Sequence, residues 1–410
     1  MRCIPKRGIM LYVVAFLVLS PPFSLAFTAD EVKNLTKYIF DTNAYDKSLR
    51  PALNQVSPTD LKVSFNLLSI NKLDELEEKL VTTAYLTLSW KDEFLTWDTT
   101  EFRINKLTLP QNWVWKPDFV LKNGFTEFKE LGGSFYYVVL AFDGTLSWKP
   151  YQVFQSQCSI DVTYFPFDTQ TCNIQFTMWS HYTYQVTLSS SSGSVEMGNY
   201  KVNKVWKITS TSQNIDNSGS NSIVTYTLNL KRKPGFYVGN IVTPILFLGV
   251  LNILVFIIPA DAGEKMSYCI TVALGFIVFL TIISSELPAN SDNTPYLAKY
   301  LQIQIFMGGI ALVISAIQLR LRHKSEEQKV YTPFKLLVKA AFCETFKAKV
   351  SCKDKSIPVH GQNKEDEDTE KYDDSITWND VSSAIDFVMF WIYVSVYCIS
   401  TITIMTILQN

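Results

Sequence analysis

Residues 264–286 read EKMSYCITVALGFIVFLTIISSE, and this stretch decides the fold of the chain. The mostly apolar residues between its two terminal glutamates number about twenty, the length that an α-helix needs to cross the hydrocarbon core of a bilayer. Such a helix carries a stripe, because hydroxyl and aliphatic residues recur along one face at alternating steps of four and three. The stripe consists of Ser267, Thr271, Leu274, Val278, Thr281 and Ser285.

The stripe has two interpretations. Small hydroxyl residues are common where membrane helices pack together, so the stripe alone favours a helix–helix contact. If several copies of the helix surround one axis, the hydroxyl groups instead hydrate passing ions, and a ring of Glu264 carboxylates concentrates cations. Leu274 and Val278 then form apolar girdles that close by dewetting. The charged ends and the rest of the chain favour this second interpretation, an oligomeric cation channel.

Three further apolar stretches are long enough to cross a bilayer, so the sequence predicts four membrane helices. Pro244 lies inside the first stretch, where its ring and its missing N–H should kink the helix. The third stretch ends in RLRH at residues 320–323, and positive charge of this kind is retained in the cytosol. The predicted helices cover residues 236–258, 264–286, about 296–319 and about 385–408.

The first 26 residues are typical of a secretory signal, with a basic end, an apolar core and small residues before Phe27. An uncleaved anchor is the alternative. With the following domain outside the cell, Glu264 lies at the cytosolic mouth of the striped helix and Glu286 at the outer mouth. The predicted divisions are a signal peptide at 1–26, an extracellular domain at 27–234, membrane helices at 235–320 with the striped helix at 265–286, a cytoplasmic loop at 321–378 and a fourth membrane helix at 379–410.

The exported domain is predicted to be an all-β sandwich of immunoglobulin type, followed by the α-helical four-span bundle. Its short apolar stretches are rich in β-branched and aromatic residues, and turn formers separate them. The sequon at Asn34 is a candidate glycosylation site. A short helix that begins at Thr28 or Asp30 should precede the strands. The clearest predicted strands are 61–70, 81–90, 133–142 and 222–231.

Composition excludes several classes of function. A formal net charge of −1 and the absence of a basic stripe argue against a nucleic-acid-binding protein. Seven cysteines without a C-x-x-C pair and three scattered histidines predict no zinc site, no redox site and no cofactor. No nucleophile–base pair stands out, so the chain is not expected to be an enzyme. Cys158 and Cys172 are the two cysteines of the exported part, which favours a disulfide between them.

The segment between Cys158 and Cys172, SIDVTYFPFDTQT, resembles the signature loop of the Cys-loop receptors, the pentameric ligand-gated ion channels. Other motifs follow in the order of that family: Trp90-Lys-Asp, Trp115-Lys-Pro-Asp, PADAGEK before the striped helix and SDNTP after it. The resemblance covers essentially the whole chain and is closest to nicotinic acetylcholine receptor subunits. It implies a pentamer, and Glu264 matches the selectivity position of the cation-conducting members.

The resemblance also implies a coupling zone where the two domains meet. Arg232 matches an arginine of the family that pairs with acidic groups, with Asp168 as one expected partner and Glu77 or Glu78 as another. A membrane-edge snorkel is the alternative for Arg232. Apolar contact between the sandwich and the striped helix is expected from Phe165, Pro166 and Pro295.

The agonist site of the family is an aromatic cage, and here the resemblance is weaker. Trp179, with Tyr182 near it, matches the position of the cage tryptophan, and core packing is its alternative role. Tyr85 replaces a tryptophan on the complementary face, and Lys122 replaces a tyrosine, so that its charge would repel an ammonium ligand. The hairpin at 209–222 contains neither an adjacent cysteine pair nor an aromatic residue and is predicted to be a flexible polar loop.

These observations give one leading function and one alternative. The leading hypothesis is a subunit of a cation-selective pentameric ligand-gated channel in the plasma membrane, opened by a ligand that binds between subunits. The alternative is an auxiliary or orphan subunit that acts in heteromers without its own principal agonist site. An adhesion protein with a helical anchor would need only one span. The expected partners are identical or related subunits, a small-molecule agonist such as a cationic amine, monovalent cations and membrane lipid, but no nucleic acid.

Overall fold

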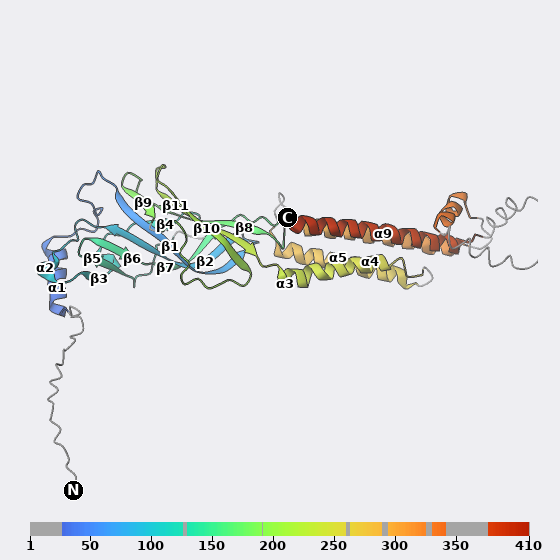
Figure 1. The fold of residues 1–410 in the computed structure, drawn as a ribbon, viewed down its shortest axis with the longest axis horizontal. Coiled ribbons are helices and arrows are strands. Elements are labelled where there is room, and N and C mark those ends of the chain that lie inside the picture. Colours follow the sequence, from blue (N-terminus) through green and yellow to red (C-terminus); the bar gives the residue numbers. More distant parts are fainter. Residues whose placement is uncertain are drawn as a thin grey trace, which may run out of the picture.

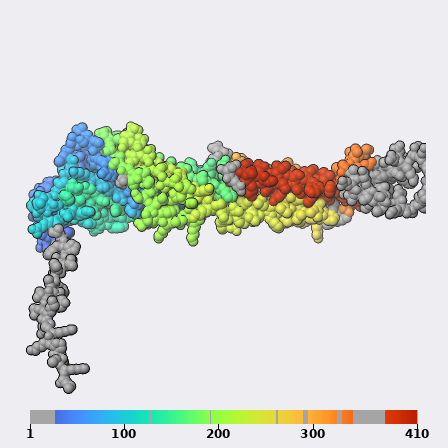
Figure 2. Space-filling view, viewed as in Figure 1, coloured from blue at the N-terminus to red at the C-terminus, as the bar shows by residue number. Residues whose placement is uncertain are grey.

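The computed structural model describes residues 27–125, 129–190, 192–259, 263–288, 294–324, 330–341 and 376–409. Within them the chain forms a β-sandwich that is followed at one end by an elongated bundle of helices (Figure 1). The two parts make one continuous, extended body in the space-filling view (Figure 2). The predicted signal peptide and most of the predicted cytoplasmic loop lie outside the described residues.

Two sheets form the sandwich. The larger has the strand order β3-β5-β6-β2-β1-β9, with β7 also paired to β2, and the smaller has the order β10-β11-β8-β4. Strands β1 and β9 run parallel, whereas the other pairs are antiparallel. The strands are β1 (Thr59–Asp74), β2 (Lys79–Lys91), β3 (Lys106–Pro110), β4 (Phe119–Leu121), β5 (Tyr137–Ala141), β6 (Thr145–Trp148), β7 (Tyr151–Gln157), β8 (Thr169–Met178), β9 (Val186–Ser190), β10 (Trp206–Asp216) and β11 (Ile223–Arg232).

Aromatic side chains fill the space between the sheets. Phe65 of β1 lies 5.1 Å from Tyr226 of β11 and 5.9 Å from Phe176 of β8, measured between ring centroids. Phe154 of β7 meets Phe176 edge-on at 5.1 Å. These strands alternate buried and exposed residues, as expected when one face of each sheet packs on the other. The sandwich predicted from the strand pattern is thereby confirmed.

Short helical elements surround the sandwich at its end farthest from the bundle. The predicted amino-terminal helix begins at Thr28, whose hydroxyl accepts from the Glu31 N–H while the Glu31 carboxylate accepts from the Thr28 N–H, a capping box. The predicted strand at 133–142 is shorter in the structure, because residues 133–136 form a turn in which Phe135 and Tyr136 stack. The elements are α1 (Ala29–Lys37), η1 (Tyr38–Thr42), α2 (Thr99–Phe102) and η2 (Gln111–Trp113).

Four helices in the described part of the chain are long and apolar enough to cross a membrane, which confirms the predicted architecture. The first consists of α3, η3 and α4 in succession. The fourth ends beside the sandwich, so the sandwich and the carboxyl-terminal end lie at the same end of the bundle (Figure 1). The bounds are α3 (Gly235–Tyr237), η3 (Val238–Val242), α4 (Thr243–Leu254), α5 (Glu264–Glu286), α6 (Tyr296–Arg322) and α9 (Trp378–Gln409).

The irregularity predicted at Pro244 is a turn of π-helix. Pro244 occupies the first turn of α4, where its missing N–H costs little, and η3 precedes it directly. The Thr243 N–H donates to the carbonyl of Val238, five residues earlier, and the Thr243 hydroxyl donates to the same oxygen at 2.9 Å. The extra residue in this turn keeps the first helix continuous without an N–H at Pro244.

Candidate functional site

The stripe of α5 is exposed along its whole length in the single chain. All six of its residues are exposed, Leu274 by 56% and Val278 by 49%. The opposite face is buried and includes Cys269, Val272 and Phe276. The stripe is therefore not the surface by which α5 packs on the other helices of its own chain. As a helix–helix contact within one chain, the packing interpretation is wrong.

Three hydroxyl groups of the stripe donate to the backbone of α5 itself. The Thr271 hydroxyl donates to the carbonyl of Ser267 at 2.9 Å, and the Thr281 hydroxyl to the carbonyl of Ile277 at 2.9 Å. The Ser285 hydroxyl donates to the carbonyl of Ile282 at 2.8 Å. This local bonding satisfies polar side chains on a helix that is otherwise apolar.

The first turn of α5 separates two opposite charges onto different sides of the helix. Glu264 is exposed, at the end of α5 away from the sandwich, whereas the Lys265 side chain is only 3% exposed and forms an ion pair with Asp386 of α9. This pair was not predicted from the sequence. An acidic residue inside a predicted span was the signal that could have revealed it, because a charge in a membrane helix usually has a partner.

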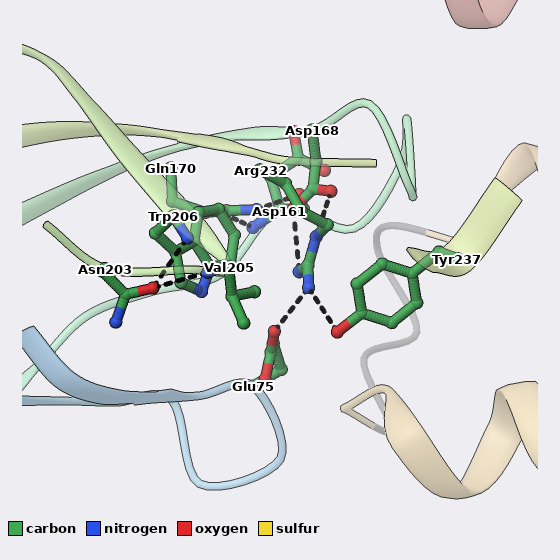
Figure 3. Close-up of polar contacts among 9 residues, drawn as sticks. All are labelled: Glu75, Asp161, Asp168, Gln170, Asn203, Val205, Trp206, Arg232 and Tyr237. Carbon is green, nitrogen blue, oxygen red and sulfur yellow. Dashed lines mark hydrogen bonds and ion pairs between the residues drawn. The ribbon is translucent and has the colours of Figure 1, made fainter. Parts of the chain in front are cut away.

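Arg232 is the centre of a second buried cluster, where the sandwich meets the helices (Figure 3). Its Nε donates to Asp168 Oδ1 at 2.7 Å and its Nη2 to Asp168 Oδ2 at 3.1 Å, a bidentate arrangement. Its Nη1 lies 2.8 Å from Glu75 Oε1 and 3.3 Å from the Tyr237 hydroxyl. The guanidinium also lies 4.3 Å from the centroid of the Trp206 ring. Arg232 is thus an interior residue and not a membrane-edge snorkel.

The electrostatics of this cluster favour the charged arginine. Burial acts against the charge, but the hydrogen bonds and charges of Asp168 and Glu75 outweigh it and raise the pKa of Arg232 above its ordinary value. The Gln170 side-chain amide holds the Asp168 carboxylate from its other side, with a distance of 2.6 Å. The cluster contains one cation and two carboxylates, and each carboxylate has a direct contact with the cation.

One partner of Arg232 was predicted wrongly. The acidic residue that reaches Arg232 from the turn between β1 and β2 is Glu75, not Glu77 or Glu78. Glu77 instead forms an ion pair with Lys79. Glu78 has a left-handed backbone, with φ 50°, and its carbonyl accepts from the Cys158 N–H. The sequence placed an acidic run in the right turn, but the side-chain directions within a tight turn were not accessible from it.

The loop closed by the Cys158–Cys172 disulfide, which the structure confirms, fills the space between the sandwich and the helices. Phe165 and Pro166 are buried, and the Phe165 ring meets Tyr237 of α3 at 5.1 Å. The contacts with α6 come from the neighbouring residues. The Tyr296 N–H donates to the carbonyl of Thr163 at 3.0 Å, and the rings of Tyr164 and Tyr296 lie 5.6 Å apart. Pro295 is the N-cap residue of α6.

The loop thus contacts the first and third membrane helices, whereas the sequence predicted contact with the striped helix itself. The Phe165 ring meets Tyr237 and the Arg232 guanidinium, which lies 5.1 Å from the ring centroid. Tyr237, Thr163 and Tyr164 therefore join the residues of this zone. Their signal in the sequence was adjacency to the expected motif, since each lies within a few residues of Arg232 or Phe165.

Trp179 lies at the surface of the sandwich, directly after β8. It is 60% exposed, so the alternative that it belongs to the core is wrong. Tyr182 is 51% exposed and stacks on Tyr184, with the two ring centroids 5.6 Å apart. A cavity of about 430 Å³ is lined by Trp179 together with Trp148, Asp118 and other residues.

Asp118 holds the segment that contains Trp179. Its carboxylate accepts from the Ser180 N–H and lies 2.7 Å from Nδ1 of His181, and its carbonyl accepts from the Trp179 N–H. Burial alone would raise the pKa of Asp118, but the hydrogen bonds with His181 and Ser180 outweigh it and hold that pKa below its ordinary value. The segment is therefore held to the Trp115-Lys-Pro-Asp loop by a charged group.

Lys122 is exposed near the β10–β11 hairpin. Hydrogen bonds from Ser218 and, as a smaller contribution, the charge of Lys122 lower the pKa of Asp216 at the end of β10. The prediction of a flexible polar loop over 209–222 is wrong, because β10 runs to Asp216 and pairs with β11 in continuous register from Ser210. Residues 209–214, TSTSQN, are all hydroxyl or amide residues, and this polar composition hid the period of two.

Tyr85 belongs to the other sheet. It lies in β2 and pairs with Tyr151 of β7, whereas Trp179 and Lys122 follow strands of the four-stranded sheet. The two halves of the expected cage thus stand on separate sheets of one chain. Asn34, the candidate glycosylation position, is exposed on α1. Modification of Asn34 stays a prediction.

Comparison with known proteins agrees with this division into a sandwich and a bundle of helices. The family described as neurotransmitter-gated ion-channel ligand binding domain matches residues 32–234, and the neurotransmitter-gated ion-channel transmembrane region matches residues 241–356. The chain is 32% identical to the neuronal acetylcholine receptor subunit beta-2 of Gallus gallus over 311 residues, 74% of this chain and 63% of that protein.

Other relatives agree. The neuronal acetylcholine receptor subunit beta-4 of Gallus gallus is 30% identical over 326 residues, 78% of this chain and 68% of that protein. The acetylcholine receptor subunit delta of Mus musculus is 33% identical over 337 residues, 77% of this chain and 64% of that protein. The chain spans a little under two thirds of the length of several of these relatives. Both of its domains nevertheless match, and it belongs to the neurotransmitter-gated ion-channel family.

Proposed function

We propose that this chain is a subunit of a cation-selective, pentameric, ligand-gated ion channel of the plasma membrane. The exposed stripe of α5 is the observation that supports this proposal most directly. The hydroxyl oxygens on the free face of α5 can still accept hydrogen bonds from water, so a water-filled passage shared with other copies suits this face better than lipid does. Glu264 at one end of the stripe would form the ring that concentrates cations.

A ligand site between subunits is the second part of the proposal. Trp179 and Tyr85 stand on different sheets of one chain, so a cage made from both positions requires the four-stranded sheet of one subunit to face the seven-stranded sheet of the next. An exposed tryptophan face attracts an ammonium group, so a small cationic amine is the ligand class that fits Trp179 and Tyr182 best. The names of the relatives, which are acetylcholine receptor subunits, agree with this class.

Coupling between the ligand site and the pore would pass through the Arg232 cluster. Asp168 stands in the disulfide loop, Glu75 in the β1–β2 turn and Tyr237 at the start of the first membrane helix, so one guanidinium connects three segments. A ligand that rotates the sandwich would move these segments together. The loop would then act on α6 through Thr163 and Tyr164.

An auxiliary or orphan subunit is the second candidate, and two observations favour it. Lys122 places a cation beside the hairpin that should close the cage, where it would repel an ammonium ligand. The hairpin tip, residues 217–222, consists of polar residues and one glycine and adds no ring to the cage. Such a subunit would contribute its pore helix to a heteromer, while related subunits provide the principal site.

Voltage-clamp recording tests both candidates. The chain is expressed alone and together with a related nicotinic subunit, and the reversal potential of the evoked current is measured in a sodium chloride gradient. Glu264→Ala should move the reversal potential towards that of chloride, because it removes the carboxylate ring. Glu286→Ala, the same change at the other end of α5, should have a smaller effect, and an unchanged potential in Glu264→Ala would contradict the pore assignment.

The same recordings separate the leading function from the second candidate. Current evoked by one ligand from cells that express this chain alone establishes a self-sufficient receptor. Current that appears only with the related subunit, and whose reversal potential depends on Glu264 of this chain, establishes an auxiliary subunit. Surface biotinylation in both experiments ensures that the chain has reached the plasma membrane.

A further inference from the structure

A buried polar cluster joins three helices at the end of the bundle farthest from the sandwich. Lys265 Nζ of α5 donates to Asp386 Oδ1 of α9 at 2.6 Å and to Gln318 Oε1 of α6 at 3.1 Å. The Gln318 amide nitrogen donates to Asp386 Oδ1 at 2.9 Å and to the carbonyl of Ser382 at 3.2 Å. The ring of Phe256, just after α4, lies 5.7 Å from the ammonium. The cluster therefore joins α5, α6 and α9, and the residues that follow α4 lie against it.

The cluster is buried deeply enough for its charges to act strongly. The Lys265 side chain is 3% exposed, the Asp386 side chain 15%, and Gln318 is fully buried. A buried cation without a counter-charge is costly, whereas a paired and hydrogen-bonded one is tolerated. Asp386 supplies the counter-charge, because Gln318 and Phe256 carry none.

Lys265 also follows Glu264 directly in the chain. The Cα atoms of the two residues lie about 3.8 Å apart, and their side chains leave α5 on different sides. Because Lys265 is buried, salt screens its charge less than it screens an exposed one. Without a counter-charge, the ammonium would offset much of the field of the carboxylate one residue away.

We propose that Asp386 is a specificity-determining residue of the pore, although it stands on a helix that carries none of the stripe. It neutralises Lys265, so that the carboxylate of Glu264 acts on permeant ions without an opposing charge. The same contacts hold the lysine on the packed side of α5, which directs Glu264 to the exposed side. Asp386 is thus a positioning residue that acts through Lys265. The inference rests on the proposed pore function.

Recording and melting of the full chain test this proposal with four variants. Asp386→Asn keeps the shape of the side chain and removes the charge. A unit charge about 8 Å away in water changes the local cation concentration about twofold, so unitary sodium conductance should fall about twofold and the reversal potential should move towards that of chloride. Lys265→Gln combined with Asp386→Asn removes both charges and should restore most of the lost sodium conductance. Lys265→Gln alone should keep sodium conductance close to that of the unsubstituted chain.

Asp380→Asn is the matched control. It is the same substitution on the same helix, but Asp380 is exposed and accepts from the Thr377 N–H and hydroxyl at the start of α9. It should change neither conductance nor reversal potential. If Asp386→Asn behaves like this control while Glu264→Ala moves the reversal potential, the role of Asp386 is overturned and the proposed function stands. If Glu264→Ala does not move the reversal potential either, the proposed pore function itself is contradicted.

Thermal melting of the detergent-solubilised protein, followed by size-exclusion fluorescence, gives a readout that does not require current. Asp386→Asn should lower the melting temperature by about 5 °C or more, because it leaves a buried cation unpaired, and the double variant should recover most of this loss. A double variant that is no more stable than Asp386→Asn overturns the pairing on which the proposal depends, even if no current is recorded. A purely structural role would restore stability in the double variant but leave the conductance of Asp386→Asn unchanged.

Discussion

Two regions of the sandwich contain charged and aromatic residues but differ in burial. They are the junction with the helices, around Arg232 and Asp168, and the proposed ligand face, around Trp179 and Lys122. At the junction, Arg232 and Asp168 are each 1% exposed, and their charges satisfy one another. On the ligand face, Trp179 is 60% exposed and Lys122 stands free of the core, near an exposed aspartate. The aromatic rings at the junction lie against a cation of the chain itself, Arg232, whereas the exposed Trp179 is proposed to bind the cation of a ligand.

The two regions differ in how well they tolerate substitution of their residues. A buried ion pair fixes its members, because loss of one leaves the other without a counter-charge in a medium of low polarity. Exposed residues can be replaced with effects within about 0.5 kcal/mol of stability, so ligand preference can vary without unfolding the domain. At the junction Arg232 pairs with Asp168 as the resemblance implied, but Glu75 takes the place expected for Glu77 or Glu78. The ligand face departs from the family at Lys122, Tyr85 and the hairpin.

Replacement of Arg232 should have the largest effect on stability and should separate the two regions most clearly. Arg232→Gln leaves the buried Asp168 and the partly buried Glu75 without a cation. This should cost about 3–5 kcal/mol and prevent most of the chain from reaching the surface. Surface biotinylation and melting of the solubilised protein measure the effect. Lys231→Gln, at the exposed neighbouring position on β11, is the control and should be close to wild type. Equal surface levels of the two variants would show that the cluster does not support the fold.

Glu75 and Glu77, two of the three glutamates of the β1–β2 turn, sharpen the comparison inside the junction. Glu75→Gln should lower stability by about 1–3 kcal/mol, because it removes a charged partner of a buried guanidinium. Glu77→Gln should change stability by less than about 1 kcal/mol, because Glu77 is half exposed and pairs with Lys79 near the surface. Melting temperatures of the two variants provide the test. A larger loss in Glu77→Gln would restore the original prediction from sequence.

Lys122→Tyr tests the ligand face and should have little effect on stability. The change removes a cation and adds a ring, so the concentration of tetramethylammonium or acetylcholine that gives half-maximal current should fall about tenfold or more. Lys106→Tyr, at an exposed position on β3 of the other sheet, is the control and should leave the half-maximal concentration unchanged. An unaltered concentration in Lys122→Tyr would place the ammonium site away from the hairpin.

Long-range periodic signals in the sequence predicted the architecture well. The stripe of α5, the four apolar stretches and the alternating strands each depend on many residues, so a few irregular positions do not obscure them. The Cys158–Cys172 disulfide followed from the two cysteines of the exported part, and the contact between Arg232 and Asp168 followed from the resemblance to a known family. The structure places all of these features as the sequence indicated.

Features that depend on side-chain direction or on polar strands were harder to predict. The choice between Glu75 and Glu77 depends on the geometry of one tight turn, and φ 50° at Glu78 shows how irregular that turn is. Strand β10 consists largely of hydroxyl and amide residues, so it lacks the apolar alternation by which strands are recognised. The partner of Lys265 is 121 residues away in sequence, and no local pattern specifies it.

The hydroxyl groups of α5 have one more consequence. Each hydroxyl has a single proton, and in Thr271, Thr281 and Ser285 that proton is committed to a carbonyl of the same helix. What these side chains turn outward is therefore oxygen lone pairs, which coordinate Na⁺ or K⁺ but offer nothing to chloride. In the proposed pore, these three residues would favour cations at their own levels of the lining, before any carboxylate contributes.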